Sequence, residues 1–283
     1  MTAGPRRVGL TPGEIVRQAV LILFGLLALF PLYFSLVNSF KDRVQYAENL
    51  LNVPSTLHPE NYGVAWTQIQ GPLLNSVIVT VTSVLATLVL ASLSAYAFAL
   101  MDFPGRHLLF GVTFALLLVP EFLTLIPLYV QIRNLTLPSN YLAIILPTIA
   151  AGQPFAILVL RAAFEAIPKD MLEAARLDGA GHLQLLRRIV LPISLPILIS
   201  VAIIRLIPVW NEYLLPSLVL DEAHRTLPVA LVSFQGGGAA TAVTPNYGAL
   251  MASYVLSAVP LLVLFAFLMR YYIQGVTSGG VKG

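Results

Sequence analysis

Residues 173–181 read EAARLDGAG and interrupt a chain that is otherwise dominated by apolar residues. The stretch holds two acidic residues, one basic residue and two closely spaced glycines, and Lys169, Arg187 and Arg188 flank it. Of the 283 residues, 58% are hydrophobic and 10% are charged, whereas a soluble domain carries about 25% charged residues. The composition therefore predicts a membrane protein in which this polar stretch lies outside the bilayer.

Six apolar stretches are each long enough to cross a hydrocarbon core of about 30 Å, at about 1.5 Å of helical rise per residue. They are residues 19–39, 73–100, 108–132, 141–164, 189–214 and 250–273. The first is too long for the apolar core of a signal peptide, and no small-residue cleavage site follows it, so we expect an anchor. The sequence predicts an all-α polytopic membrane protein with six transmembrane helices.

The distribution of Lys and Arg predicts the orientation, because cytoplasmic loops carry an excess of these residues. With the N-terminus inside, the inner side holds Arg6, Arg7, Arg17, Arg106, Arg161, Lys169, Arg176, Arg187, Arg188, Arg270 and Lys282. The outer side holds only Lys41, Arg43, Arg133 and Arg225. We therefore expect both termini, and the loop between the fourth and fifth spans, in the cytoplasm.

The polar stretch in this loop has the pattern of a short helix that ends at a sharp corner. Pro168 suits the first helical position, because its missing N–H would be unpaired there. Lys169–Leu177 contains good helix formers, with Met171, Leu172 and Ala175 on an apolar face. Such a rigid amphipathic helix is suited to docking on another protein.

The corner is expected at Gly179, in the left-handed conformation that ends many helices. Gly181 then lets the chain leave steeply into a second helix, which runs through Leu185, Leu186 and Ile189 towards Leu191 and Pro192. An alternative is a solvated loop in which Glu173 pairs with Lys169 or Arg176, a contact worth only about 0.2–0.5 kcal/mol. The residues alone leave both interpretations open.

The motif Glu173-Ala174-Ala175, three residues, Gly179, nine residues, Ile189-x-Leu191-Pro192 resembles the EAA loop of bacterial ABC importer permeases. Three further segments resemble the smaller, maltose-type permease of the carbohydrate-uptake branch. They are Trp210-Asn211-Glu212, Thr226-Leu227-Pro228 and the glycine-rich tail at 275–283. The resemblance extends from Ala19 onward. One departure is Gly181, where relatives often carry a serine able to cap the second helix.

This resemblance implies a coupling helix, seated in a cleft of a separate ATPase subunit, that contains Leu172, Glu173, Ala174, Ala175, Arg176 and Asp178. Glu173 would face a basic group of the ATPase, and Ala174 and Ala175 would permit close approach. Gly179 would fix the angle at which motion passes to the fourth and fifth spans. The implied partners are an ABC ATPase dimer, a second permease subunit that forms a heterodimer with this chain, and an extracytoplasmic sugar-binding protein.

ATP hydrolysis is expected in the partner, because this chain has no Gly-x-x-x-x-Gly-Lys-Ser/Thr phosphate loop. No cofactor is expected in the chain itself. The absence of cysteine excludes disulfides and thiolate metal sites, and the four histidines are scattered, so no metal site is predicted. The net charge of +3 argues against a nucleic-acid partner. The chain is expected to act as a transport component and not as an enzyme.

Polar side chains inside spans are costly and commonly functional. Glu121, Gln153 and Arg205 lie within the third, fourth and fifth predicted spans. Counted from the cytoplasmic ends of their spans, Glu121 and Arg205 both lie about 18–20 Å deep, and this matched depth with opposite charge predicts an ion pair. The pair is either structural or part of the sugar path. Asn211 and Glu212, at the outer edge of the fifth span, are candidate gate residues or simply solvated.

The predicted domain organisation has four parts: a cytoplasmic tail at 1–18, the first span and outer loop at 19–72, the permease domain at 73–274 and a cytoplasmic tail at 275–283. The predicted function is the permease subunit of a sugar importer in the inner membrane. A secondary transporter of a small polar solute is the alternative, but such proteins are commonly built from internal repeats, and none is visible. A membrane-embedded enzyme would need a nucleophile or metal constellation, which the sequence lacks.

Overall fold

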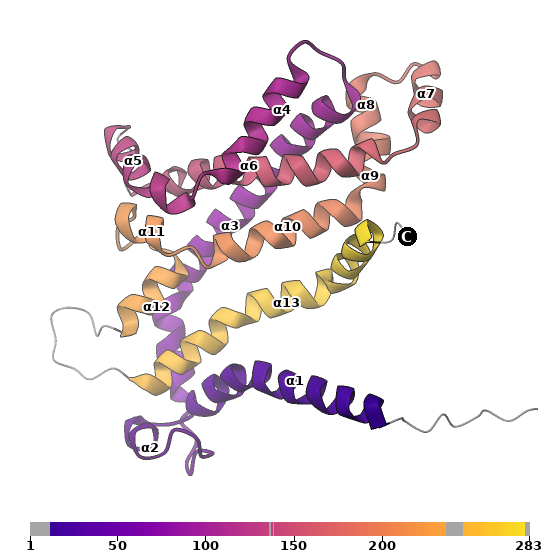
Figure 1. Ribbon diagram of the computed structural model, residues 1–283. Helices are drawn as coiled ribbons and strands as arrows, with labels where there is room; N and C mark the ends of the chain where they lie inside the picture. The colour runs from indigo at the N-terminus through magenta and orange to yellow at the C-terminus, as the bar shows by residue number, and fades with distance from the viewer. Residues whose placement is uncertain (1–11, 136, 138, 236–245, 281–283) are drawn as a thin grey trace, which may run out of the picture. The chain divides into compact units, whose positions relative to one another are not determined.

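The computed structural model describes the backbone of residues 12–135, 137, 139–235 and 246–280 (Figure 1). Side chains are described for the same residues, except positions 121, 235, 268 and 270–280. Every regular element within these ranges is helical, so the predicted all-α fold is confirmed.

The first half of the chain contains α1 (Pro12–Asn38), α2 (Arg43–Glu48), α3 (Glu60–Leu100), α4 (Arg106–Ala115), the short 3-10 helix η1 (Leu116–Leu118) and α5 (Glu121–Asn134). The second half contains α6 (Leu142–Glu165), α7 (Lys169–Leu177), α8 (His182–Leu185), the π-helical turn η2 (Leu186–Val190), α9 (Leu191–Ile193), α10 (Leu195–Trp210), α11 (Leu214–Val219), α12 (Leu227–Gln235) and α13 (Tyr247–Gly280). α13 continues through positions that the sequence predicts as a separate tail.

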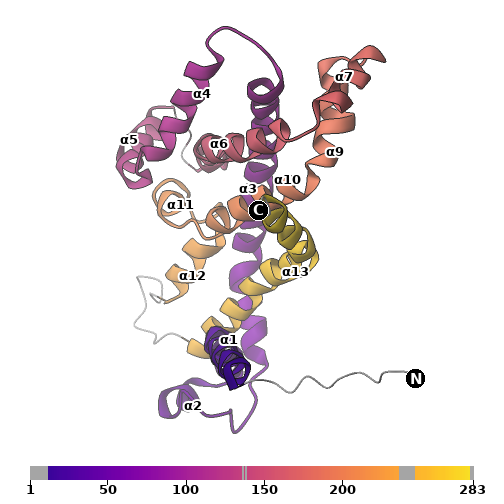
Figure 2. The same ribbon diagram turned by 45° about the vertical axis from the view of Figure 1, so that its right-hand side comes forward.

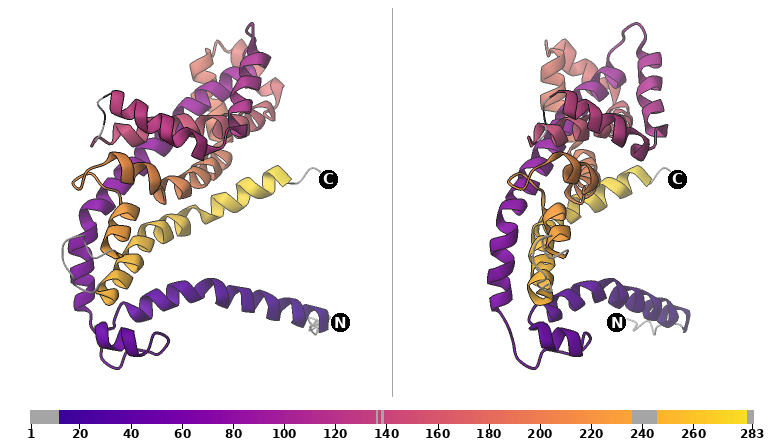
Figure 3. Two further views of the ribbon diagram at one scale, coloured as in Figure 1. Left: turned by 60° about the vertical axis from the view of Figure 1, so that its left-hand side comes forward. Right: turned by 90° about the vertical axis from the view of Figure 1, so that its left-hand side faces the viewer.

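Among the described residues, the helices α1, α3, α6 and α13 are each long and apolar enough to cross a membrane. Two bent pairs raise the number to as many as six if each pair is one span. Two boundaries differ from the prediction, because α1 begins at Pro12 and α3 already begins at Glu60. Figure 3 shows α3 as a single unbroken helix.

The third and fifth predicted spans are not straight helices. α4–η1 and α5 meet at 102°, and the segment before Ser194 meets α10 at 77°. Proline disfavours helical backbone in the preceding residue, and Val119, before Pro120, is extended with ψ 115°. Ser194 leaves helical geometry with ψ 7°, two residues before Pro196, which has no N–H to donate. Each of the spans predicted at 108–132 and 189–214 is therefore broken into two helical segments.

The chain divides into two compact units, Met1–Thr67 with Gly237–Ala258, and Gln68–Gly236 with Val259–Gly283. Within the second unit, α6 packs along α10, as Figure 2 also shows. A buried apolar cluster joins α3, α6, α7, the turn around η2 and α10, with Leu160, Phe164, Leu172, Val190 and Val201 at its centre. Through Leu172, this cluster packs α7, the helix formed by the first part of the polar stretch, against the other helices.

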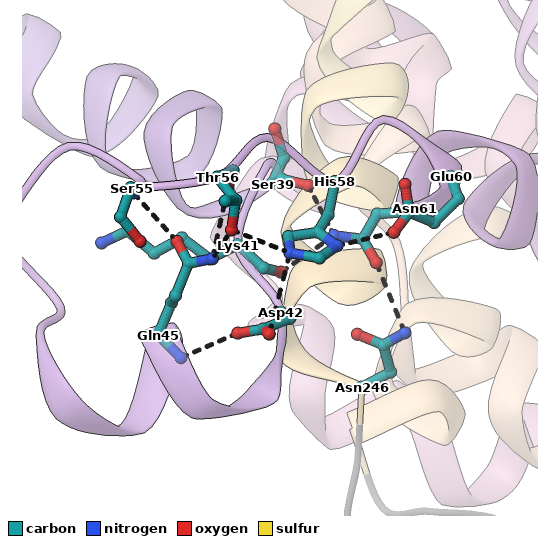
Figure 4. Close-up of polar contacts among 10 residues, drawn as sticks. All are labelled: Ser39, Lys41, Asp42, Gln45, Ser55, Thr56, His58, Glu60, Asn61 and Asn246. Carbon is teal, nitrogen blue, oxygen red and sulfur yellow. Dashed lines mark hydrogen bonds and ion pairs between the residues drawn. The ribbon is translucent and has the colours of Figure 1, made fainter.

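The first unit is organised around a buried polar turn after α1 (Figure 4). Lys41 is only 1% exposed, and its Nζ donates to the carbonyls of Asn49 (2.6 Å) and Leu50 (3.3 Å). Burial lowers the pKa of Lys41. The Asn61 amide donates to the carbonyls of Ser39 and Lys41, both at 2.9 Å. The buried Lys41 ammonium and the Asn61 amide thus find their hydrogen-bond acceptors within the same unit.

Candidate functional site

The ends of α7 follow from the residues that flank it. Pro168 is the N-cap, with ψ 128°, so the helix begins one residue later than predicted, at Lys169. At the other end Gly179 has φ +84°, which confirms the predicted left-handed corner. The N–H of Ala180 donates to Ala175 O and that of Gly179 donates to Arg176 O, both at 3.0 Å. This pair of bonds is the Schellman motif, which satisfies carbonyls left free at a helix C-terminus.

The inner face of α7 is narrower than the sequence predicts. Leu172 is 5% exposed and Ala175 packs against the same apolar cluster. Met171 was wrongly predicted for this face, since it is 45% exposed. The outer face is formed by exposed residues: Lys169, Asp170, Glu173, Ala174, Arg176, Leu177 and Asp178. Ala174 therefore lies on the free face and Ala175 on the packed one.

No ion pair joins Glu173 to Lys169 or Arg176 within the described part of the chain. Arg176 instead reaches across to α3 and donates to Leu100 O at 3.4 Å. A pocket of about 300 Å³ lies between α7 and the turn after α3. It is lined by Leu100, Asp102, Arg106, Lys169, Glu173 and Arg176, among others. The carboxylate of Glu173 is thus exposed beside a charged recess.

The chain leaves the corner through Gly181, which is extended (ψ 167°) and forms the N-cap of α8. A glycine offers no side-chain cap, but Gln184 Oε1 accepts a bond from the Gly181 N–H at 3.2 Å. The predicted second helix runs through Leu185 and Leu186, which are both buried, and it widens into a π turn ahead of Pro192. Pro192 cannot donate the usual bond to the carbonyl four residues earlier, and a wider turn accommodates this.

His182, the first residue of α8, contacts the second span. The hydroxyl of Tyr96 on α3 lies 3.0 Å from His182 Nδ1, and the two rings pack edge to face at 6.0 Å. Figure 1 shows α8 beside the C-terminal end of α3. The sequence reasoning missed both residues, because the contact joins positions 86 apart in the chain.

The predicted polar residues inside spans take different positions. Gln153 lies on α6, and its amide donates to Thr87 O on α3 (3.4 Å) and to Ile149 O (3.3 Å). Arg205 on α10 packs against Gly152 of α6, where a Cβ would lie 3.1 Å from the arginine Nε. Gly152 therefore makes room for the guanidinium, and both Gln153 and Arg205 connect neighbouring helices.

Glu121 is the first residue of α5, directly after the break at Pro120. Because the helices that carry Glu121 and Arg205 both follow a break, a count of residues along the chain does not place the two side chains at equal depth. The side chain of Glu121 lies outside the described residues, so the ion pair itself stays a prediction.

Asn211 and Glu212 follow the end of α10. The Asn211 amide donates to Ile207 O at 2.9 Å, and Glu212 Oε1 accepts from Leu215 N at 3.2 Å, at the start of α11. Both line a pocket of about 320 Å³ with residues of α5, α6 and α11, including Phe122, Thr124, Thr148 and Tyr213. Aromatic faces and polar groups in one pocket suit a ligand that is partly apolar and partly hydrogen-bonding.

Polar residues of α3 also hold the segment that contains Thr226-Leu227-Pro228. The Asn75 amide donates to Ala223 O (3.1 Å) and Arg225 O (3.0 Å), and Tyr141 donates to Asn75 Oδ1 (2.8 Å). Ser76 accepts from Leu227 N at 2.8 Å. Asn75 and Ser76 could have been recognised from the sequence, because two adjacent polar side chains within a span are costly to bury unless they are hydrogen-bonded.

The segment between α11 and α12 has internal bonds as well. Asp221 accepts from the backbone N–H of His224 (3.0 Å) and contacts its Nδ1 (2.6 Å). The hydrogen bond from the His224 side chain lowers the pKa of Asp221. The His224 ring packs edge to face on Tyr141 at 5.2 Å.

Residues 87–278 match the family of binding-protein-dependent transport system inner membrane components. The matched part is more than half of the chain and contains α7, its corner and the π turn. The chain belongs to this family. It is a multi-pass membrane protein of the inner membrane, and the family consists of transport components.

Curated relatives match over nearly the whole chain. A probable ABC transporter permease protein of Bacillus subtilis, YurM, is 33% identical over 96% of this chain and 89% of its own length. The arabinooligosaccharides transport system permease AraQ of Halalkalibacterium halodurans is 35% identical, over 91% and 92%. The trehalose/maltose transport system permease MalG of Thermococcus litoralis is 31% identical, over 95% and 99%.

The fold also matches a solved structure. A chain of a bacterial ABC transporter involved in the import of the acidic polysaccharide alginate superposes with a TM-score of 0.78, covering 96% of this chain and 99% of that one. The sequence identity is 22%, so this likeness concerns the fold alone. The family and the fold decide against the alternative of a secondary transporter.

Proposed function

We propose that this chain is the permease subunit of a binding-protein-dependent ABC importer for a sugar, and that it forms half of the translocation path. The observation that carries the proposal is the full-length similarity to permeases named for arabinooligosaccharides and for trehalose and maltose. The sugar class comes from these relatives, and the pocket beside Asn211 and Glu212 is the part of the second unit suited to receive it.

α7 is the coupling helix in this proposal. Its inner face is fixed by Leu172 and Ala175, while Glu173, Ala174, Leu177 and Asp178 are exposed for contact with a separate ATPase. Leu177 is 90% exposed and would lie in this contact. The Schellman corner at Gly179 holds the helix at a fixed angle to α8.

The complex requires three partners: an ATPase dimer that binds ATP, a second permease and an extracytoplasmic binding protein. With α7 on the cytoplasmic side, the predicted orientation follows, with six spans and both termini inside. This chain supplies no cofactor chemistry of its own, and the ATPase supplies the energy.

The test is reconstitution of the chain in proteoliposomes with the second permease, the ATPase and the binding protein encoded with it. Uptake of labelled trehalose, maltose and arabinooligosaccharides is measured with and without ATP and binding protein. We expect uptake of at least one sugar that requires both. Uptake that proceeds without either component contradicts the proposal.

Glu173→Lys tests the coupling helix in the same system. Charge reversal places like charges together at a basic docking site, so the ATPase should no longer co-purify and uptake should cease. Glu165→Lys is the matched control, because Glu165 ends α6 nearby and forms only an i,i+4 pair with Arg161 at 2.8 Å, a contact worth about 0.3–0.5 kcal/mol. Normal co-purification and uptake with Glu173→Lys would show that the carboxylate is not in the interface.

A further inference from the structure

The cytoplasmic end of α3 is attached to both sides of the Gly179 corner. On one side, Arg176 of α7 donates to Leu100 O, a carbonyl that has no partner within the helix at this position. On the other side, His182 of α8 contacts the Tyr96 hydroxyl at 3.0 Å. Tyr96 is 4% exposed, so this contact is shielded from solvent. Displacement of α7 and α8 therefore has to displace α3.

A second attachment lies earlier in α3, at Asn75 and Ser76. Asn75 is 7% exposed and Ser76 is 2% exposed, and together they bond to three backbone groups, at residues 223, 225 and 227. Tyr141 orients the Asn75 amide by donating to its oxygen. The segment 220–227, which joins α11 to α12, thus moves with α3.

Between these two attachments α3 has the properties of a stiff rod. Residues 73–100 contain neither proline nor glycine, and Pro72 is the one proline inside the helix. From Asn75 to Tyr96 the helix spans about 32 Å at 1.5 Å per residue, the full hydrocarbon thickness. In contrast, α5, α6, α10 and α13 each contain an internal proline, and the third and fifth spans are broken.

We propose that α3 transmits the stroke of the coupling helix across the membrane to the segment 220–227. Tyr96 and His182 are the positioning residues on the cytoplasmic side, and Asn75, about 32 Å away along α3, is the positioning residue on the far side. The inference rests on the proposed coupling role of α7. It adds the second span to the fourth and fifth spans, which are joined to the corner through the chain itself. The third and fifth spans are broken near prolines, whereas the part of α3 between Asn75 and Tyr96 has no break and carries the displacement.

The test uses the assembled complex and measures ATP hydrolysis with and without the binding protein, which is loaded from a mixture of trehalose, maltose and arabinooligosaccharides. Tyr96→Phe removes the hydroxyl but keeps the ring that packs in the apolar cluster. One hydrogen bond contributes about 0.5–1.5 kcal/mol, so the ratio of stimulated to unstimulated hydrolysis should fall about twofold to twelvefold. Asn75→Asp should reduce the ratio in the same way, because it removes the donor to two carbonyls.

His182 offers a matched pair of variants. The asparagine side-chain oxygen lies near the place of Nδ1, whereas a glutamine reaches the place of Nε2. We therefore expect His182→Asn to keep the ratio and His182→Gln to lower it as Tyr96→Phe does. Since Tyr96 and Asn75 act in series on one helix, the double variant should be no worse than the poorer single variant. Tyr62→Phe is the control, since it removes a hydroxyl bond to Ser39 (2.8 Å) in the other unit.

The outcomes separate this inference from the proposed function. If binding protein does not stimulate hydrolysis by the wild-type complex, the proposed function fails. If it does, and Tyr96→Phe, His182→Gln and Asn75→Asp all retain the wild-type ratio, the transmission by α3 is overturned. A lower melting temperature of the Tyr96→Phe complex with an unchanged ratio also overturns it, because the hydroxyl would then serve stability alone.

Discussion

At the scale of single residues, the glycines of this chain serve different purposes. Gly179 is required by its backbone, since φ is +84° and an added Cβ would meet nothing within 4 Å. Gly248 has ordinary helical backbone but is required by space, because a Cβ there would collide with Lys41 O and with the Asn61 amide. Gly181 needs neither, as its extended conformation is open to any residue.

Substitutions at Gly179 should follow backbone preference alone. Asparagine tolerates the left-handed conformation and should unfold near the wild-type temperature. Alanine should cost about 1–2 kcal/mol, and the β-branched Val should cost more. Thermal unfolding of the purified complex, together with sugar uptake, gives the order. If Gly179→Val matches wild type in both, the left-handed corner does not limit stability or coupling.

Gly248→Ala should destabilise the first unit by about 1–3 kcal/mol, since overpacking forces side chains and backbone apart. Gly63→Ala is the matched change within the same unit, where the new methyl group meets nothing within 4 Å. It should stabilise α3 by about 0.5–1 kcal/mol. Melting temperatures of the two variants should therefore move in opposite directions. A shift of the same sign in both would show that helix propensity, and not contact with Lys41, governs position 248.

At the scale of elements, two of the predicted spans are broken. Both breaks coincide with a proline, at Pro120 and at Pro196, and the interrupted helices bring α5, α6 and α11 around the pocket beside Asn211 and Glu212. Non-helical backbone inside a membrane is tolerated where protein or a water-lined cavity surrounds it. The breaks are therefore consistent with helices that line a path.

The predicted pair of Glu121 and Arg205 belongs to this scale, because it would join α5 to α10 across the break. Removing one partner of a buried pair typically costs about 3–5 kcal/mol. Glu121→Gln and Arg205→Gln should each lower the melting temperature of the complex, and the double variant should recover much of the loss. Recovered stability with uptake indicates a structural pair, and recovery without uptake indicates residues of the path. Losses that simply add would show that the two side chains do not meet.

At the scale of the whole molecule, the proposed function assigns ATP binding to a separate subunit. A ligand that binds only the folded state raises the melting temperature according to its concentration relative to its Kd. A non-hydrolysable ATP analogue at about 100 times its Kd should stabilise the assembled complex by about 2.7 kcal/mol and leave the isolated chain unchanged. The measurement is a thermal shift with and without the analogue. A shift of the isolated chain would contradict the assignment of ATP binding to the partner.

The sequence by itself determined the features that depend only on residues close together in the chain. The apolar stretches identify the spans, the run at 169–181 specifies a helix and its left-handed corner at Gly179, and the EAA pattern identifies the family. Each of these follows from local composition, periodicity or one backbone preference. Met171 was wrongly predicted on the apolar face of α7, and Pro168 was wrongly predicted as its first helical residue. The face and the boundary of a helix can each shift by one residue with little change in the local sequence pattern.

Only the tertiary structure decided which distant residues meet. The contacts of Tyr96 with His182 and of Asn75 with residues 223 and 225 join positions 86 to 150 apart. No local pattern specifies such pairs, because they exist only after the apolar cluster has set the helices against one another. The breaks at Pro120 and Ser194 likewise depended on packing, since proline is tolerated within the helices α5 and α6 but ends a helix at these two places.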